Sequence, residues 1–464
     1  MNGLVCLAVT RVALTGLGGI DFQTQIDAVA ARGGGRVTVP CGRHWTKGLV
    51  LRSNVELHLA DGAYLLGSSR TEDYSLVKLP YSEGDWRAVV MGVGVTNVAI
   101  TGHGIIDGQG GAFPQVGVYS GGEYERGLRP RGLFFANCRD VRLADFLFRD
   151  SACWGVVFKC CDGVTVERLT IDNHVNHNND GIDVEARNVT IRDCDVDSGD
   201  DAICIKSNDP HFVVENVLVS NVTARSHSNA LKLGTASHGT MRNIRFVDCR
   251  TEAPRHDYLD KRTETSAPRF CFTNAERFET RPGLTPYEQS GIAGIAIENV
   301  DGGVAEDISF CNIDVAGNAV PIFVRGGRRM KRKCGIPPSD RCVLRNILIE
   351  NVKGSATTFI ASSITGVEGC RARNVTLRNV RIACRAADRA RAEAAKAAPV
   401  PEHPGAYPES NMFRPNRILP AYGLYVRHAD GVVLDDVTFT LPSGAADTRA
   451  EIVKDDAEVR MIRE

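Results

Sequence analysis

Residues 177–207 read H-N-N-D-G-I-D-V-E-A-R-N-V-T-I-R-D-C-D-V-D-S-G-D-D-A-I-C-I-K-S. The middle of this segment, from Asn188 onward, alternates apolar and polar residues as a half-buried β-strand does. Asp180 precedes it, and the pair Asp200 and Asp201 begins 20 residues after Asp180. If each such segment is one coil of a stacked parallel sheet, equivalent positions on neighbouring coils lie about 4.8 Å apart. The segment therefore predicts a coil whose turns bring three carboxylates onto one small patch of surface.

The same strand pattern, an Asn, Asp or Gly followed by alternating apolar residues, recurs along the chain. Its copies begin at Asn97, Asp140, Gly163, Asn188, Asn216, Asn243, Asp307, Asn346, Asn374 and Gly431. The starts at 140, 163, 188, 216 and 243 are 23, 25, 28 and 27 residues apart. A period of roughly 20–30 residues, with short β-branched strands and no amphipathic helix between them, is typical of a β-solenoid. A leucine-rich repeat has a similar period but needs a Leu/Asn consensus that is absent here.

The asparagine that begins most copies is expected to be structural. Asn tolerates the left-handed conformation and bonds its own backbone, so it suits a tight corner, and stacked corners can form an amide ladder. The alternating apolar residues are expected to fill the dry interior of the coil. The expected fold class is therefore all-β, with a single solenoid domain over residues 21–464 after an N-terminal segment of residues 1–20.

Two stretches of the chain favour helices. Residues 23–31, before a run of three glycines, predict a short helix that caps the first coil and covers its open edge. Residues 386–398 are rich in strong helix formers. With the Pro-rich loop that follows, they predict an insertion between two coils at about 385–420. Insertions from one face of a solenoid often build its binding face.

The composition excludes several kinds of function. A net charge of −1 with no large basic excess argues against a nucleic-acid-binding surface. No apolar run approaches the ~20 residues of a membrane span, so we expect no membrane association. The first residues lack the basic region and the cleavage site of a signal peptide. We expect a monomer.

The 15 cysteines are scattered and odd in number, which fits buried thiols better than a disulfide framework. Most of them, such as Cys194, Cys204 and Cys311, stand at strand positions that we expect to point inward. Cys334 and Cys342 flank a short loop and form the pair most suited to a disulfide. No Cys/His spacing resembles a zinc site, and no metal or cofactor is predicted.

Taken together, these segments resemble glycoside hydrolase family 28, the group of polygalacturonases and rhamnogalacturonan hydrolases. The resemblance rests on N-N-D-G-I-D from Asn178 and S-G-D-D from Ser198. It extends over nearly the whole chain through G-G-G-R-V-T-V-P at 33–40, L-R-S-N-V-E-L-H-L at 51–59, D-S-A-C-W-G at 150–155 and L-P-A-Y-G-L-Y-V-R-H at 419–428. The resemblance implies a right-handed parallel β-helix, and an inverting hydrolase that cleaves α-galacturonide linkages in pectic polysaccharide or oligosaccharide. It also implies a periplasmic or secreted protein, with the cytoplasm left open.

The resemblance assigns roles to the three aspartates by motif position. Asp200 is the general acid that protonates the leaving oxygen, while Asp180 and Asp201 hold and deprotonate the attacking water. Crowding by two neighbouring carboxylates is expected to keep Asp200 protonated near neutral pH. The structural alternative is a solvated acidic corner.

Two motifs of the family are altered in this chain. S-N-A-L-K-L-G at 228–234 stands where polygalacturonases carry G-H-G-I-S-I-G, so Asn229 replaces the His and Lys232 replaces a Ser. G-I-A-I-E at 294–298 stands in place of G-I-R-I-K, which removes the Arg and Lys that hold the galacturonate carboxylate. Substrate contacts are therefore expected to have moved to Lys232, Arg325 and the late insertion. The segment around Arg325, P-I-F-V-R-G-G-R-R, resembles bacterial exo-acting galacturonidases, which favours exo action.

The substrate-binding residues expected from these arguments are Asn178, Lys206, His227, Asn229, Lys232 and Arg325. Each has a simpler alternative, since an asparagine can cap a turn, a lysine can balance the aspartates, a histidine can belong to a turn and an arginine can be solvated. Trp86 and Trp154 could stack on sugar rings, although Trp154 lies in a repeat and favours the core. A basic run could attract an anionic polysaccharide or form a solvated face; it comprises Arg328, Arg329, Lys331, Arg332 and Lys333.

Two other functions stay open at this point. A polysaccharide lyase would use a base such as Lys206 or Lys232 against a substrate carboxylate bridged by calcium. A non-catalytic carbohydrate-binding solenoid would account for the two altered motifs. In each case the expected partner is an acidic polysaccharide or oligosaccharide.

Overall fold

The computed structural model describes residues 19–114, 128–256, 290–330, 339, 341–405 and 418–462. Part of the basic run, Lys331 to Lys333, lies outside the described residues, and so does Cys334. No helix within the described ranges is long and apolar enough to cross a membrane.

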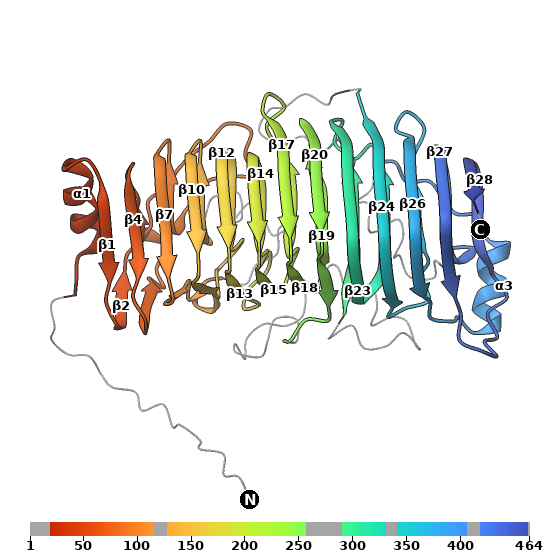
Figure 1. Cartoon of the computed structure of the whole chain (residues 1–464), viewed down its shortest axis with the longest axis horizontal. Coiled ribbons are helices and arrows are strands. Elements are labelled where there is room, and N and C mark those ends of the chain that lie inside the picture. Colours follow the sequence, from red (N-terminus) through yellow and green to blue (C-terminus); the bar gives the residue numbers. More distant parts are fainter. Residues whose placement is uncertain are drawn as a thin grey trace, which may run out of the picture.

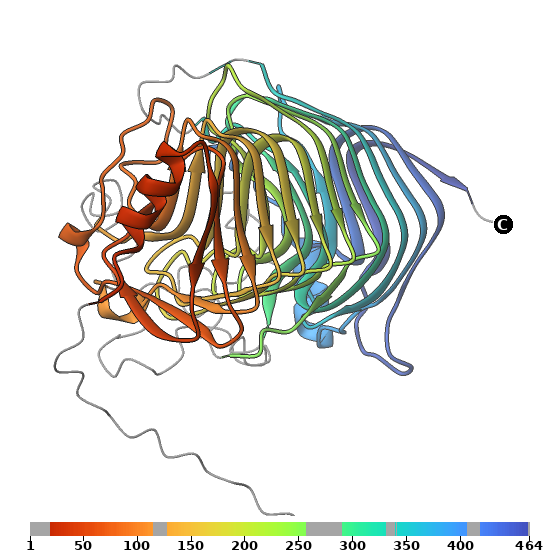
Figure 2. The same cartoon turned by 60° about the vertical axis from the view of Figure 1, so that its left-hand side comes forward.

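The chain winds into a parallel β-helix whose coils stack along one axis (Figures 1 and 2). Strands one coil apart pair in parallel and in register, as when Val189 of β14 (Ile182–Arg192) lies beside Val217 of β17 (Val213–Ser220). The same parallel pairing continues from the first coils to the last. The solenoid predicted from the repeat period is confirmed.

Each coil contributes strands to three ladders. The first ladder contains β1 (Gly35–Val39), β4 (Val55–Leu59), β7 (Thr96–Gly102), β10 (Arg139–Ala144), β17 and β20 (Thr240–Val247). The second contains β2 (Gly42–Thr46), β5 (Ala63–Gly67), β8 (Ile105–Asp107), β11 (Leu147–Arg149), β13 (Thr170–Asn173), β15 (Asp195–Ser198), β18 (Thr223–Ser226) and β21 (Arg250–Glu252). The third contains β3 (Leu49–Val50), β6 (Ala88–Val93), β9 (Arg131–Ala136), β16 (Ile203–Ser207), β19 (Asn229–Ser237), β22 (Gly291–Asn299) and β25 (Ser362–Thr365).

The longer strands bend at a corner and belong to more than one ladder. They are β12 (Val156–Glu167), β14, β23 (Val304–Gly326), β24 (Val343–Ala356), β26 (Ala372–Ala383), β27 (Ala421–Thr440) and β28 (Ala450–Ile462).

Asparagines form the predicted corner before the first ladder. Asn188, Asn216 and Asn243 have φ of 56°, 56° and 52°, in the left-handed region that Asn tolerates. The Asn216 side-chain amide donates to Asn188 Oδ1 at 3.0 Å, and Asn243 donates to Asn216 Oδ1 at 2.7 Å. Each amide bonds the next coil, so the amide ladder expected from the sequence is confirmed.

The interior of the coil is apolar, and the outward positions carry the polar groups. Ile203 and Ile205 of β16 are fully buried in the main core, and the rings of Phe246 and Phe310 stack at 4.5 Å. Complete burial of one such large side chain contributes about 1.5–3 kcal/mol. Residues that alternate with these point outward, and on the third ladder they build the candidate site.

Helices lie at the two expected places. Helix α1 (Phe22–Ala31) begins after Asp21, whose side chain accepts from the Thr24 backbone N–H at 3.0 Å, and it packs Phe22 and Ile26 against the first coil. Helix α3 (Arg389–Ala397) lies in the late insertion near the C-terminal end (Figure 1). Both helices confirm the prediction, and short 3₁₀ turns occur at η1 (Thr71–Asp73) and η2 (Gly110–Ala112).

The cysteine predictions need two corrections. Cys342 forms a disulfide with Cys370, 28 residues later, and not with Cys334. The pair lies on successive coils, a proximity that follows from the coil length and not from a short loop. Cys194 is buried in the core as expected, but Cys204 points outward between two core isoleucines, and Cys311 is partly exposed.

Candidate active site

The three aspartates lie on the turns that precede the third ladder. Ile182 and Ile203 are register partners, which makes Asp180 and Asp201 equivalent positions on successive coils. The Gly181 N–H donates to the Asp201 carbonyl at 2.8 Å, so these turns are stacked. The predicted clustering of carboxylates is therefore present.

A lysine separates two carboxylates on one side of this cluster. Lys206 Nζ lies 3.0 Å from Asp180 Oδ2 and 2.6 Å from Asp183 Oδ1, and 3.8 Å from the centre of the Trp154 ring. The sequence argument missed Asp183. The signal for it was available, because a carboxylate between the inward residues Ile182 and Val184 must point to the outer face of the strand.

A second lysine holds the other side of the cluster. Lys232 Nζ lies 3.1 Å from Asp201 Oδ2 and 3.3 Å from Glu298 Oε2, and only 2 % of its side chain is exposed. Glu298 stands where the family carries a lysine, and it is fully buried. Lys232 is thus engaged by carboxylates of the protein itself, which favours the charge-balancing alternative over contact with a uronate.

Two asparagines position the aspartates. The Asn229 side chain donates to Asp201 Oδ1 at 2.9 Å and its backbone N–H donates to the same oxygen at 3.2 Å. Asn229 is fully buried, and these two contacts favour a positioning role for it over the predicted contact with substrate. Asn178 donates to Asp200 Oδ2 at 3.3 Å and accepts from Arg129 Nη2 at 3.0 Å. Asn178 therefore orients Asp200.

His227 lies away from the aspartate side chains. It is fully buried, with its ring 5.6 Å from that of His174 and its Nε2 2.8 Å from the His256 carbonyl. Burial, with a smaller contribution from His174, lowers the pKa of His227 to about 3. These contacts favour the simpler alternative for His227, a residue of the turn, over the predicted contact with substrate.

The two tryptophans are buried and offer no stacking surface for a sugar. Trp86 stacks on Phe134 at 4.6 Å, so its expected sugar contact is wrong. Trp154 belongs to the same apolar cluster, as its position in a repeat favoured. In the basic run, Arg329 pairs with the buried Asp301 and is not a solvated residue.

The two adjacent aspartates differ in protonation. Burial, followed by the Asp201 charge, raises the pKa of Asp200 to about 6. Burial also acts on Asp201, but Lys232, Lys206 and the Asn229 amide outweigh it and hold the pKa of Asp201 below its ordinary value. Burial and the neighbouring Asp183 raise the pKa of Asp180 well above its ordinary value. Of the three aspartates predicted from the sequence, these shifts favour the carboxylate form for Asp201 and the carboxylic acid form for Asp180 and Asp200 at mildly acidic pH.

Arg325 is the register partner of Glu298 on the next strand of the third ladder, so the two residues occupy equivalent outward-facing positions. Its Nη1 makes long hydrogen bonds to Thr365 Oγ1 at 3.4 Å and to the Gly366 carbonyl at 3.3 Å. Arg325 is 5 % exposed, and burial lowers its pKa to about 10. No carboxylate of the described residues forms an ion pair with it.

The late insertion docks onto the same region. The Pro404 carbonyl accepts from the Arg328 N–H at 2.7 Å, and the Val400 carbonyl accepts from Arg427 Nη1. His428 Nε2 lies 3.0 Å from Glu402 Oε1. These contacts fix the segment around Glu402 against the coils that follow Arg325.

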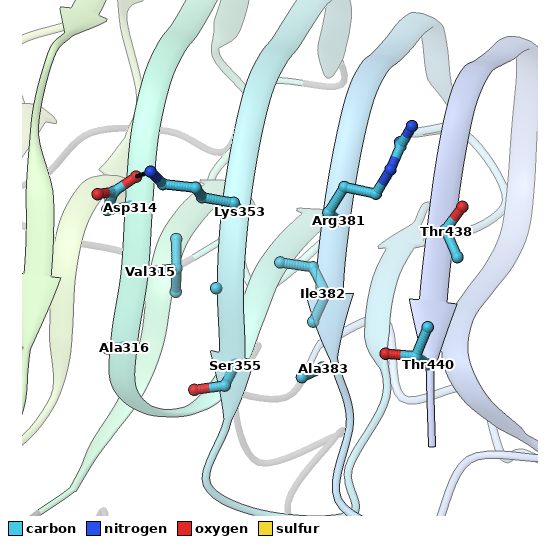
Figure 3. A pocket seen from close by; sticks show the side chains of 11 residues that line it. Asp314, Val315, Ala316, Lys353, Ser355, Arg381, Ile382, Ala383, Thr438 and Thr440 are labelled. Atoms are coloured by element: carbon cyan, nitrogen blue, oxygen red, sulfur yellow. Dashed lines mark ion pairs between the residues drawn. The ribbon is translucent and has the colours of Figure 1, made fainter. Parts of the chain in front are cut away.

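A hollow of about 520 Å³ lies on another face of the β-helix (Figure 3). Its lining includes Lys353, Gly354 and Arg381, and each of its two cations already pairs with a carboxylate, Lys353 with Asp314 and Arg381 with Asp436. Among the described residues, no group of three His, Cys, Asp or Glu side chains is arranged to hold a metal ion.

A parallel β-helix with paired acidic groups of opposite protonation on its turns has the features of a glycoside hydrolase. Residues 76–226 match the family model described as Glycosyl hydrolases family 28.

Curated polygalacturonases are similar to parts of this chain. A probable polygalacturonase of Vitis vinifera is 27% identical over 246 residues, which cover 49% of this chain and 50% of the relative. Polygalacturonase-2 of Solanum lycopersicum is 23% identical over 303 residues, which cover 64% of this chain and 55% of the relative. The chain thus spans about half the length of the curated relatives it matches.

Solved structures share the fold at low identity. The exopolygalacturonase of Thermotoga maritima aligns with a TM-score of 0.60 at 19% identity, over 78% of this chain and 82% of that chain. The family 28 exopolygalacturonase of Yersinia enterocolitica aligns with a TM-score of 0.63 at 18% identity, over 95% of this chain and 74% of that chain.

Proposed function

We propose that this protein is an inverting glycoside hydrolase that cleaves α-galacturonide linkages in pectic polysaccharide or oligosaccharide, acting from a chain end. The right hand of the coil and a periplasmic or secreted location belong to the same proposal, on the likeness to family 28. The observation that carries it is the different contacts of two adjacent aspartates, since Lys232 and Asn229 hold Asp201 whereas Asn178 orients Asp200.

Hydrolysis needs an acid for the leaving oxygen and a base for the attacking water. Asp200 supplies the acid, because its raised pKa keeps a proton on the carboxyl at mildly acidic pH and Asn178 orients its Oδ2. Asp201 supplies the base, because Lys232 and Asn229 hold it ionised. The two roles fall on adjacent residues whose surroundings shift their pKa values apart.

Asp180 helps to hold the attacking water. Lys206 fixes its Oδ2, and its buried Oδ1 makes no hydrogen bond within the described residues, so we assign the contact with a bound water to that atom. In an inverting reaction, the water attacks the face of the sugar opposite the leaving oxygen, and Asp201 removes its proton as Asp200 protonates the leaving oxygen.

The position of the late insertion supports the proposal of exo action. Residues around Val400 and Pro404 lie against the coils beyond Arg325, so a polysaccharide chain that runs along the third ladder would meet them after a few sugars. The likeness of the Arg325 segment to exo-acting galacturonidases supports the same proposal.

The lysine contacts argue against a lyase. A lyase base must release its proton, but Asp180 and Asp183 hold the pKa of Lys206 well above its ordinary value although burial acts to lower it. Lys232 lies between two carboxylates, which also stabilise its protonated form.

Product analysis on defined pectic oligosaccharides tests the proposal. The purified protein should release galacturonic acid one residue at a time from saturated oligogalacturonides or from rhamnogalacturonan oligosaccharides that end in galacturonate, followed by chromatography. An unsaturated, UV-absorbing product would select a lyase. Binding without any product would select a non-catalytic solenoid, and an early ladder of intermediate sizes would overturn exo action.

A further inference from the structure

Arg325 is buried without a carboxylate partner, which is an unfavourable arrangement for a cation. An unpaired charge taken out of water destabilises the folded protein, so buried charges in native structures are almost always paired. Two other buried cations follow this rule, since Lys159 pairs with Glu185 at 2.8 Å and Arg449 pairs with Asp447 at 2.7 Å. Arg325 departs from it.

The contacts of Arg325 leave one edge of its guanidinium open. Both of its hydrogen bonds use Nη1, and both are long, at 3.4 Å and 3.3 Å. The Nε and Nη2 groups, which together form the fork that a carboxylate binds in bidentate fashion, have no partner among the described residues. Glu402 is near enough for its charge to act against the lowering of the Arg325 pKa by burial, but the ion pairs of the neighbouring carboxylates are with other groups, Glu402 with His428 and Glu298 with Lys232.

The location of Arg325 connects it to the carboxylate cluster. Asp201 contacts Lys232, Lys232 contacts Glu298, and Glu298 is the register partner of Arg325 on the adjoining strand. Adjacent strands are about 4.8 Å apart. Arg325 therefore lies only one strand beyond the pair that surrounds Asp201, on the side that the late insertion closes.

The acidic residue at position 298 explains why the substrate carboxylate would be bound at a different position. The family places a cation at this position to hold the galacturonate carboxylate, whereas here an acidic side chain occupies it and its charge is balanced by Lys232. A substrate carboxylate would therefore find no unpaired cation at position 298. The next outward position of the row carries Arg325.

We propose that the open edge of Arg325 binds the carboxylate of the terminal uronic acid residue, with the segment around Glu402 closing the site behind it. This inference rests on the proposed function and names the group that selects its substrate. It assigns to Arg325 the contact with the carboxylate that the sequence also offered to Lys232.

A cycle of two substrates and two proteins tests this proposal. Trigalacturonic acid and its methyl ester differ in the charge of the carboxyl groups, so comparing both on wild-type protein and on Arg325→Gln isolates the contact between the arginine and the carboxylate. Arg325→Gln should lower kcat/KM for the acid by about 10- to 100-fold, the range for a hydrogen bond to a charged group. The same variant should change kcat/KM for the ester less than about threefold.

Matched variants separate this effect from damage to the fold. Arg325→Gln removes an unpaired buried charge, so its melting temperature should equal or exceed that of the wild type. If it fails to fold, Arg325→Lys retains the charge without the fork and should still lose activity on the acid selectively. Arg378→Gln, on an exposed arginine paired with Glu350 and Asp435, should leave both substrates unaffected.

Equal losses on the acid and the ester would overturn the role of Arg325 and leave the hydrolase proposal standing. If the wild type hydrolyses neither substrate, the proposed function fails, and calorimetric titration with D-galacturonic acid and with galactose decides the inference alone. Binding of the acid that Arg325→Gln abolishes would support it. Equal binding of both sugars, or no binding of either, would overturn it.

Discussion

Two stacked turns of this β-helix have the same geometry and opposite energetic consequences. At the corner before the first ladder, Asn188, Asn216 and Asn243 stack so that each later side-chain amide donates to the asparagine of the preceding coil. At the turn before the third ladder, Asp180 and Asp201 occupy equally stacked positions, and like charges placed side by side repel. The first stack stabilises the coil, whereas the second costs free energy.

The acidic turn persists because cations surround it. Lys206 lies between Asp180 and Asp183, and Lys232 lies between Asp201 and Glu298. Departures from the locally most stable choice concentrate at functional sites. The comparison therefore teaches that the coil supplies the spacing, while the residue type decides whether a stack supports the fold or the chemistry.

The largest expected effect on activity comes from removing the proposed general acid, Asp200, at the acidic turn. Asp200→Asn should lower kcat by about 10²- to 10⁴-fold, the usual contribution of general acid catalysis. Its melting temperature at pH 7 should not fall, since the substitution relieves repulsion with Asp201. Steady-state kinetics and thermal unfolding check both parts. Retention of more than about a tenth of wild-type turnover would reject Asp200 as the acid.

Removing Lys232 from the acidic turn should lower the stability of the fold and raise the pKa of Asp201. Lys232→Met leaves Asp201 and Glu298 as buried carboxylates without their shared partner, which should cost about 3–5 kcal/mol in the free energy of unfolding. The pKa of Asp201 should rise, so the acidic limb of kcat/KM should move to higher pH. The double variant Lys232→Met/Glu298→Gln should recover part of the stability. Denaturant unfolding that shows no loss in the single variant would contradict the ion-pair account.

The pH dependence follows from the two adjacent aspartates. The acid Asp200 must be protonated and has a pKa of about 6, so kcat/KM should fall tenfold per pH unit above that value. The base Asp201 must be ionised and has a pKa below 3.8, so activity should persist down to about that pH. A rate profile from pH 3 to 8 checks this, and a plateau that extends beyond pH 7.5 would be inconsistent with Asp200 as the acid.

The smallest effect is expected in the stabilising stack. Asn216→Ala removes one amide from the corner and places a residue with a Cβ but no polar side chain at φ 56°, which should cost about 1–2 kcal/mol. Turnover should stay unchanged, because Asn216 is on the first ladder and touches no residue of the carboxylate cluster in the described contacts. A loss of kcat without a loss of stability would show that the two stacks are coupled.

The parts that sequence analysis predicted are those that repeat or lie close in the chain. The period, the corner asparagines and the clustering of Asp180 with Asp201 follow from the coil spacing, and α1 and α3 follow from local propensity. The disulfide was mispredicted because Cys342 meets Cys370 through the register of successive coils.

The other errors arose where the role of a residue depends on the direction of its side chain or on a partner far away in the sequence. Asn229 and His227 belong to one altered motif, yet its turn buries both, one against Asp201 and the other against His174. Lys232 was taken for a substrate contact because Glu298, 66 residues later, was seen as a lost cation and not as a new partner. Alternation alone does not show which outward charge another strand neutralises.

The most direct test of the catalytic assignment is the anomeric configuration of the first product. Proton NMR of freshly released galacturonic acid, recorded within the first minutes of trigalacturonic acid hydrolysis by the wild type, reports on which face the water attacks. An inverting reaction at an α-linkage, with Asp201 as base and Asp200 as acid, predicts the β anomer first and no release by Asp200→Asn. Initial accumulation of the α anomer would contradict the assignment.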